Sequence, residues 1–136
     1  MLVAGLQQLV VADAGVQAAI GTRFYPVLIP ENVTYPCATY QVISDVPDYL
    51  LDGTKGLATI RLQVDTWSGG PANATYAQAK AAQKAIRSVL ELYRGVLPDG
   101  TRVAGVFVTN AMDGFEQDSR SYRTTTDYMV TFYLGA

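Results

Sequence analysis

One short segment constrains the fold of this chain more than any other feature. At the centre of Leu57–Trp67, aliphatic residues alternate with polar or charged ones. The two sets are Ile60, Leu62 and Val64, and Arg61, Gln63 and Asp65. A period of two is typical of a β-strand with one buried and one wet face. A wet face favours an antiparallel sheet over a parallel sheet buried on both sides.

Three further segments have strand character. Ala38–Val46 is rich in β-branched and aromatic residues, which favour strands. Arg102–Ala111 alternates more weakly. Residues 125–134 place one set of side chains on each face, namely Tyr128, Val130, Phe132 and Leu134, and Thr125, Asp127, Thr131 and Tyr133. We therefore expect about four strands.

Helical spacing separates the second and third of these strands. Within Ala72–Tyr93 apolar residues recur three and four positions apart, which predicts one apolar stripe on a helix. Residues 2–11 read as a helix, and Asp13 is a suitable N-cap for a short helical piece, Ala14–Ile20. Residues 22–36 hold three of the prolines and read as a loop with at most one short strand, residues 23–25.

These elements predict the fold class. We expect one α+β domain over residues 1–136, because that length fits a single core. The domain contains an antiparallel sheet of about four strands with helices packed on one face, in the order α-β-β-α-β-β.

Composition narrows the chemistry. The chain has no histidine and one cysteine, which excludes histidine triads, histidine metal sites and cysteine-rich zinc sites. Its serines have no recognisable activating partner. The three aspartates at 45, 48 and 52 lack the spacing of a calcium loop, and Gly53–Gly56 reads as a turn. We therefore predict a non-enzyme without cofactor or metal. A net charge of −2 argues against a protein whose main role is to bind nucleic-acid phosphates.

Targeting signals are weak. The apolar stretch Met1–Ala12 has no basic residue and is too short to span a bilayer. Two glycosylation patterns begin at Asn32 and Asn73, and without a secretory signal we interpret them as chance matches. We expect synthesis in the cytoplasm, no membrane partner, and a reduced, buried Cys37.

The wet face of the sheet allows two interpretations. Its charged residues Arg61, Asp65, Arg123 and Asp127 are placed for cross-strand ion pairs. The same face also suits contact with another subunit, because interface cores lose charge and gain tyrosine, and this chain has nine tyrosines and only 16% charged residues.

Two segments stand out as docking candidates. Residues 47–56 and 112–122 join strands, and both exceed the usual hairpin loop of about 2–5 residues. Each combines apolar or aromatic side chains with charges. Either these side chains fold back onto the sheet, or they anchor a partner protein. The candidate interaction residues are Asp48, Tyr49, Leu50, Leu51, Asp52, Lys55, Phe115, Glu116, Asp118, Arg120, Tyr122 and Arg123.

The order and spacing of several short segments resemble a known family. The chain is similar to the tail-completion or tail-terminator proteins of long-tailed bacteriophages, which are encoded among the head–tail joining genes. The segments that carry this resemblance are the opening Leu-rich helix, Asp13 with Val16, residues 20–26 (IGTRFYP), residues 28–30 (LIP), Pro36, residues 40–44 (YQVIS), residues 64–67 (VDTW), and Tyr76 with Ala79.

The resemblance implies a structural protein of the virion, placed at the tail–neck junction. It implies a homo-oligomeric ring, usually a hexamer, that ends polymerisation of the tail tube and provides the surface for head–tail joining. The implied partners are the tail tube protein and a neck or connector protein on the head side, with DNA passing through the lumen without specific binding.

Three alternatives remain open from the sequence. The first is another neck component, a connector or stopper between portal and tail. The second is a small-molecule-binding or hydrolytic α+β domain, for which Asp65 or Asp127 would have to be buried and unpaired in a pocket. The third is a structural subunit of a non-phage assembly.

Overall fold

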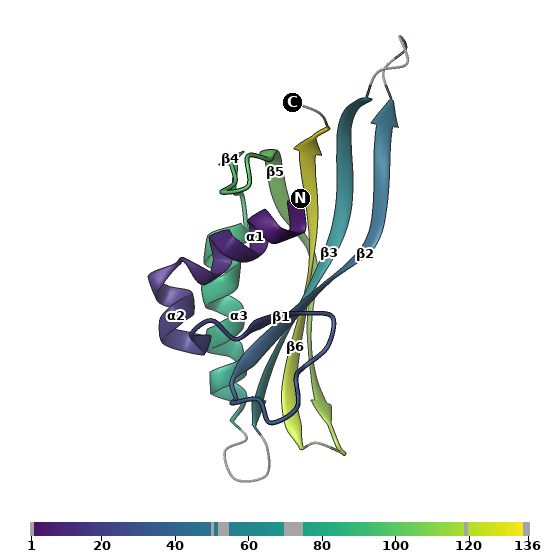
Figure 1. The fold of residues 1–136 in the computed structure, drawn as a ribbon. Helices are drawn as coiled ribbons and strands as arrows, with labels where there is room; N and C mark the ends of the chain where they lie inside the picture. Colours follow the sequence, from purple (N-terminus) through teal and green to yellow (C-terminus); the bar gives the residue numbers. More distant parts are fainter. Residues whose placement is uncertain (1, 50, 52–54, 70–74, 119, 135–136) are drawn as a thin grey trace.

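The computed structural model describes residues 2–49, 51, 55–69, 75–118 and 120–134. It contains one six-stranded sheet and three helices that lie on one face of that sheet (Figure 1). The elements in chain order are α1 (Leu2–Val11), α2 (Ala14–Ile20), β1 (Phe24–Pro26), β2 (Cys37–Tyr49), β3 (Lys55–Gly69), α3 (Tyr76–Leu90), β4 (Gly95–Val96), β5 (Arg102–Glu116) and β6 (Ser121–Tyr133).

The sheet order is β1-β2-β3-β6-β5-β4. The strand β1 runs parallel to β2, and every other neighbouring pair is antiparallel. The two central strands, β3 and β6, pair from Leu57 opposite Tyr133 to Gly69 opposite Ser121. The prediction of a four-stranded antiparallel sheet in the order α-β-β-α-β-β is therefore wrong, because the sheet is mixed and has six strands.

Two strands were outside the predicted set of about four; β1 overlaps the one short strand that the sequence allowed at residues 23–25, and β4 was not predicted. The strands β1 and β4 have three and two residues, so neither contains a full cycle of alternation. Both lie at an edge of the sheet, which is where a strand ending in Pro26 can be accommodated, because proline has no N–H to donate to a ladder.

Much of the two segments predicted as long loops is strand. The strand β2 continues to Tyr49 and β3 begins at Lys55, while β5 continues to Glu116 and β6 begins at Ser121. Both connections are therefore hairpins with long arms. The four long strands have 13 to 15 residues each, which corresponds to about 43–50 Å at ~3.3 Å per residue.

The core lies between the helices and the sheet. The helix α1 buries Leu2, Leu6 and Val10, and α3 buries Ala82, Ile86 and Leu90 among others. The sheet contributes the alternating apolar side chains of β3 and β6, including Leu62, Val64, Tyr128 and Val130. Burial of these apolar side chains supplies the main favourable term for folding.

Capping residues start the second and third helices. The Asp13 carboxylate accepts a hydrogen bond from the Val16 amide at 3.0 Å, as predicted for an N-cap. Gly21 follows α2 at a φ of 63°, a conformation that glycine adopts at little cost. Thr75 caps α3 by accepting from the Gln78 amide.

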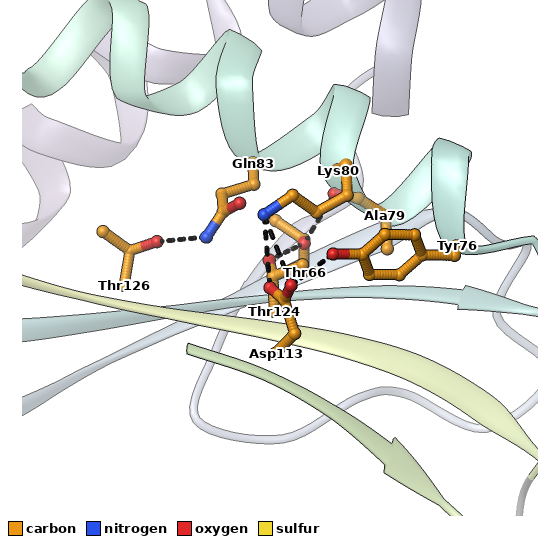
Figure 2. Close-up of polar contacts among 8 residues, drawn as sticks. All are labelled: Thr66, Tyr76, Ala79, Lys80, Gln83, Asp113, Thr124 and Thr126. Atoms are coloured by element: carbon orange, nitrogen blue, oxygen red, sulfur yellow. Dashed lines mark hydrogen bonds and ion pairs between the residues drawn. The ribbon is translucent and has the colours of Figure 1, made fainter. Parts of the chain in front are cut away.

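A buried polar seam attaches α3 to the sheet (Figure 2). The Thr66 hydroxyl donates to the Ala79 carbonyl at 2.9 Å and is also hydrogen-bonded to the Thr124 hydroxyl. One turn further along α3, the Gln83 amide donates to the Thr126 hydroxyl at 2.9 Å. These bonds fix the position of α3 relative to β3 and β6, because leaving such buried groups unpaired is costly.

Within the described residues, no single helix is long and apolar enough to cross a membrane. The pair α1 and α2 reaches that length only together, and the pair is bent by 81°.

Candidate docking surfaces

The candidate interaction residues fall into two groups at opposite ends of the sheet. The β2–β3 hairpin closes with Tyr49 opposite Lys55, and the β5–β6 hairpin closes with Glu116 opposite Ser121. Because β3 and β6 are antiparallel neighbours, their starting ends lie far apart (Figure 1). The structure therefore presents two separate surfaces rather than one combined site.

The β2–β3 hairpin presents an aliphatic end. Leu51 is fully exposed, and the Val46 side chain is 61% exposed. Of the other candidates in this segment, Asp48 and Tyr49 end β2 and Lys55 begins β3. Leu50 and Asp52 lie outside the described residues. An exposed leucine at the end of a hairpin is a suitable anchor for a partner protein.

The β5–β6 hairpin carries a row of aromatic rings on its helix-covered side. The rings of Phe115 and Tyr122 meet edge to face, with centroids 5.0 Å apart. The Tyr122 ring in turn meets that of Tyr76, at the start of α3, at 5.7 Å. Phe115 and Tyr76 are both partly exposed. The aromatic side chains thus fold back onto the protein and still present part of their surface to solvent.

Asp113 connects this hairpin to α3 (Figure 2). Its carboxylate accepts a hydrogen bond from the Tyr76 hydroxyl and pairs with the Lys80 ammonium at 3.3 Å. The Tyr76 hydrogen bond, followed by the Lys80 contacts, lowers the pKa of Asp113, although partial burial opposes this. The same hydrogen bond raises the pKa of Tyr76. The charged carboxylate is therefore the favoured form in this contact.

The opposite side of the hairpin carries Arg123, which contacts an acidic and an aromatic side chain. Arg123 forms an ion pair with Glu116 at 3.1 Å, and its guanidinium lies 5.5 Å from the centroid of the Trp67 ring. Both contacts restrain the guanidinium on this face of the sheet. The remaining candidates, Asp118 and Arg120, lie in the turn and are exposed.

The helix-free face of the sheet carries a cross-strand polar network. Asp127 accepts from Arg61 at 2.6 Å and from Gln63 at 3.1 Å. It is only 3% exposed. Asp65 accepts from the Thr125 hydroxyl at 2.6 Å, and its pKa is raised mainly by burial, with the Thr125 hydrogen bond opposing the shift.

The predicted cross-strand ion pairing is confirmed for Arg61 with Asp127, whereas Arg123 pairs with Glu116 instead. Asp65 and Asp127 are both hydrogen-bonded, so neither is the buried, unpaired carboxylate on which the hydrolytic interpretation depended.

Two side chains with potentially nucleophilic groups, Ser68 and Cys37, are buried within the fold. The Ser68 hydroxyl donates to the Thr75 carbonyl at 2.6 Å, immediately before α3. Cys37 is fully buried, and burial raises the pKa of its thiol to about 11. In the part of the chain that the structure describes, no cluster of three or more His, Cys, Asp or Glu side chains is placed to hold a metal ion.

Sequence reasoning missed the contact between α3 and the β5–β6 hairpin. Asp113 was included only as part of a loop. The spacing of Tyr76 and Lys80, one helical turn apart on one face, is the signal that two donors share an acceptor, but it does not identify that acceptor.

Comparisons with known proteins identify a family and a shared fold. A family model described as tail completion protein gp17 matches residues 4–133. No curated protein gives a significant match. Among solved structures, a chain from the virion of a native gene transfer agent particle is similar, with a TM-score of 0.73 and 21% sequence identity, over 96% of this chain and 93% of that chain. A likeness at this identity shows a shared fold.

Proposed function

The chain belongs to the tail completion protein gp17 family and is a structural protein of phage tails, and we propose that it caps the tail tube as a ring of identical copies. The ring, a hexamer in this proposal, ends polymerisation of the tube and provides the surface on which head and tail join. The tail tube protein binds one end of the ring, and a neck or connector protein binds the other.

One observation carries this proposal: the two ends of the sheet are chemically unlike. The β2–β3 hairpin presents an exposed aliphatic side chain, Leu51, at its end. The β5–β6 hairpin presents aromatic rings on one side and the Arg123–Glu116 ion pair on the other. A polymer that grows by stacking rings needs matching ends. A subunit that matches the growing end with only one of its own two ends stops that growth, since the other end is the wrong template for the next ring.

The charges on the helix-free face are compatible with a lumen through which DNA passes. Four of the charged groups on this face form two ion pairs, Arg61–Asp127 and Arg123–Glu116. In the proposed ring this face lines the lumen and the helices lie outside. Paired charges expose little net positive charge to phosphates, so DNA passes without specific binding.

Tube assembly in the presence of the protein tests this function. Purified tail tube protein is polymerised with and without the chain, and tube lengths are measured by electron microscopy. We expect tubes to stop growing at ends that carry the protein. Leu51→Asp and Asp118→Arg alter the two hairpin ends separately, and Lys84→Glu on the exposed side of α3 is the matched control.

We expect one hairpin variant, and not the control, to restore tube growth. The other hairpin variant is expected to keep the cap but lose capture of the head-side protein. Unchanged tube length with the wild-type protein would contradict the terminator role. Capture of only a portal-side adaptor would identify a connector or stopper instead.

A further inference from the structure

Two strands of the sheet expose both faces and one edge. On β2 every residue from Val42 to Pro47 is exposed, and on β5 every residue from Thr109 to Asp113 is exposed. Strands of a soluble domain normally bury at least one face. Among these residues are apolar side chains with more than 40% of their surface exposed, namely Val42, Ile43, Val46 and Met112.

The outer backbone edges of the same stretches have no strand beside them. The strand β1 pairs with β2 only at Ala38–Tyr40, and β4 pairs with β5 only at Arg102 and Val103. Within the described residues, the outer edge of β2 beyond Tyr40 and that of β5 beyond Val106 have no backbone partner. A long unpaired edge with exposed apolar side chains is a template for another strand.

We infer that these two edges pair with each other between neighbouring copies, so that β5 of one protomer adds to β2 of the next and the ring is a closed β-barrel. This inference rests on the proposed ring and names the contact that closes it. The interface is heterologous, as a cyclic ring requires, because one patch meets a different patch on the neighbour.

Strand direction supports this pairing. The run β2-β3-β6-β5 is antiparallel throughout and contains four strands. Its two outer members therefore run in opposite directions. Rotation about the central axis of the ring relates the copies and leaves the direction of each strand along that axis unchanged. The β5 of one copy thus meets the β2 of the next in an antiparallel ladder, which continues the pattern within each copy.

The stagger of the two edges supports closure. Along the registry of the sheet, Ala111 on β5 lies on the same row as Tyr40 on β2, through Thr126 and Val64. Centre-to-centre pairing of the exposed stretches places Ala111 opposite Asp45 of the neighbour, five residues beyond Tyr40. The bulge between Val42 and Ser44 takes up one of these residues.

The resulting shift corresponds to the geometry of known barrels. Four residues amount to ~13 Å along the strands, and four strand spacings amount to ~19 Å across them. The ratio corresponds to a strand tilt of about 35°, at the edge of the 35–45° range in which sheets close into barrels. Edges without stagger would favour a flat ribbon.

Paired cysteines test the contact. In this register Val46 of one copy lies opposite Asn110 of the next, and both occupy helix-free rows, through their partners Thr59 and Asp127. The double variant Val46→Cys with Asn110→Cys is made in a Cys37→Ala background. It is oxidised with tail tubes present and absent, and the products are resolved under denaturing conditions. The single variants, and Val46→Cys with Lys84→Cys, are the controls.

We expect a ladder of covalent multimers from the double variant and none from the controls. Native mass measurement under reducing conditions shows whether the double variant forms rings. If rings form but oxidation gives no covalent ladder, the edge pairing is refuted and the proposed ring still stands. Dimers from Val46→Cys alone would overturn it in favour of an isologous β2–β2 contact. Absence of rings with and without tubes would refute the proposed ring, and the pairing with it.

Discussion

The threonine pair beneath α3 leads to the prediction that a double substitution is more stable than one of its single substitutions. Thr66 and Thr124 are 1% and 0% exposed and are hydrogen-bonded to each other. Because the Thr66 hydroxyl donates its proton to the Ala79 carbonyl at 2.9 Å, Thr124 is the donor within the pair. Thr66→Val keeps the shape of the side chain and leaves the Thr124 hydroxyl buried without its acceptor.

The expected magnitudes follow from that geometry. Leaving one buried hydroxyl unsatisfied costs about 1–3 kcal/mol, whereas replacing both partners by apolar groups of the same shape is nearly neutral. The Ala79 carbonyl lies within α3 and retains its helical hydrogen bond in either variant. The double variant Thr66→Val with Thr124→Val is therefore expected to be more stable than Thr66→Val alone, by about 1–2 kcal/mol.

Urea titrations followed by far-ultraviolet circular dichroism measure these free energies of unfolding. The control is the pair Thr59 and Thr131, which joins the same two strands at 3.1 Å on the helix-free face and is only partly buried. Thr59→Val is expected to cost less than Thr66→Val, because solvent reaches the remaining hydroxyl. Losses that simply add in the Thr66–Thr124 double variant would refute the reasoning.

Three further predictions follow from individual side chains. The Cys37 thiol, fully buried and with its pKa raised to about 11, is expected to react with a thiol reagent at pH 8 only as fast as the protein unfolds; a rapid reaction in the native protein would contradict its burial. Because the pKa of Asp113 is held below its ordinary value of 3.8, chiefly by Tyr76, its hydrogen bond stabilises the fold above that pH and the stabilisation is lost as the pH falls through and below it. Tyr76→Phe should therefore lower the urea midpoint at pH 7 and lose this effect once the pH is low enough to protonate Asp113 in the folded protein. An effect that grows on acidification would be inconsistent with the sign of the shift. Arg61→Ala should cost about 1–2 kcal/mol, because it removes the charged donor from the buried Asp127 carboxylate while the Gln63 donor remains; a urea midpoint equal to that of the wild type would show that the pair contributes nothing.

The long elements were predictable because their patterns extend over several residues. The alternation around Ile60, Leu62 and Val64 indicated β3, and all three side chains are buried. The predicted helix over Ala72–Tyr93 corresponds to α3, which begins and ends closer to the centre of the stripe. The strand β4 gave no comparable signal, and for β1 the sequence allowed only one short strand at residues 23–25. The predicted number of strands and the predicted antiparallel sheet were therefore wrong.

Hairpin length was missed for a different physical reason. Asp113 and Gly114 have low strand propensity, and local chemistry therefore indicated a loop. In the structure both residues pair with β6, opposite Thr124 and Arg123, because register with a long central strand outweighs propensity. The residues of the candidate surfaces were identified from their composition, but their separation to opposite ends depends on the β3–β6 pairing, which connects segments far apart in the sequence.

The most direct test of the account is electron cryomicroscopy of tail tubes assembled with this protein. We expect a closed ring of copies at one tube end, with one hairpin of each copy against the tube and the other directed away from it. Tube ends without the protein, or a protein that stays monomeric in the presence of tubes, would contradict the central claim.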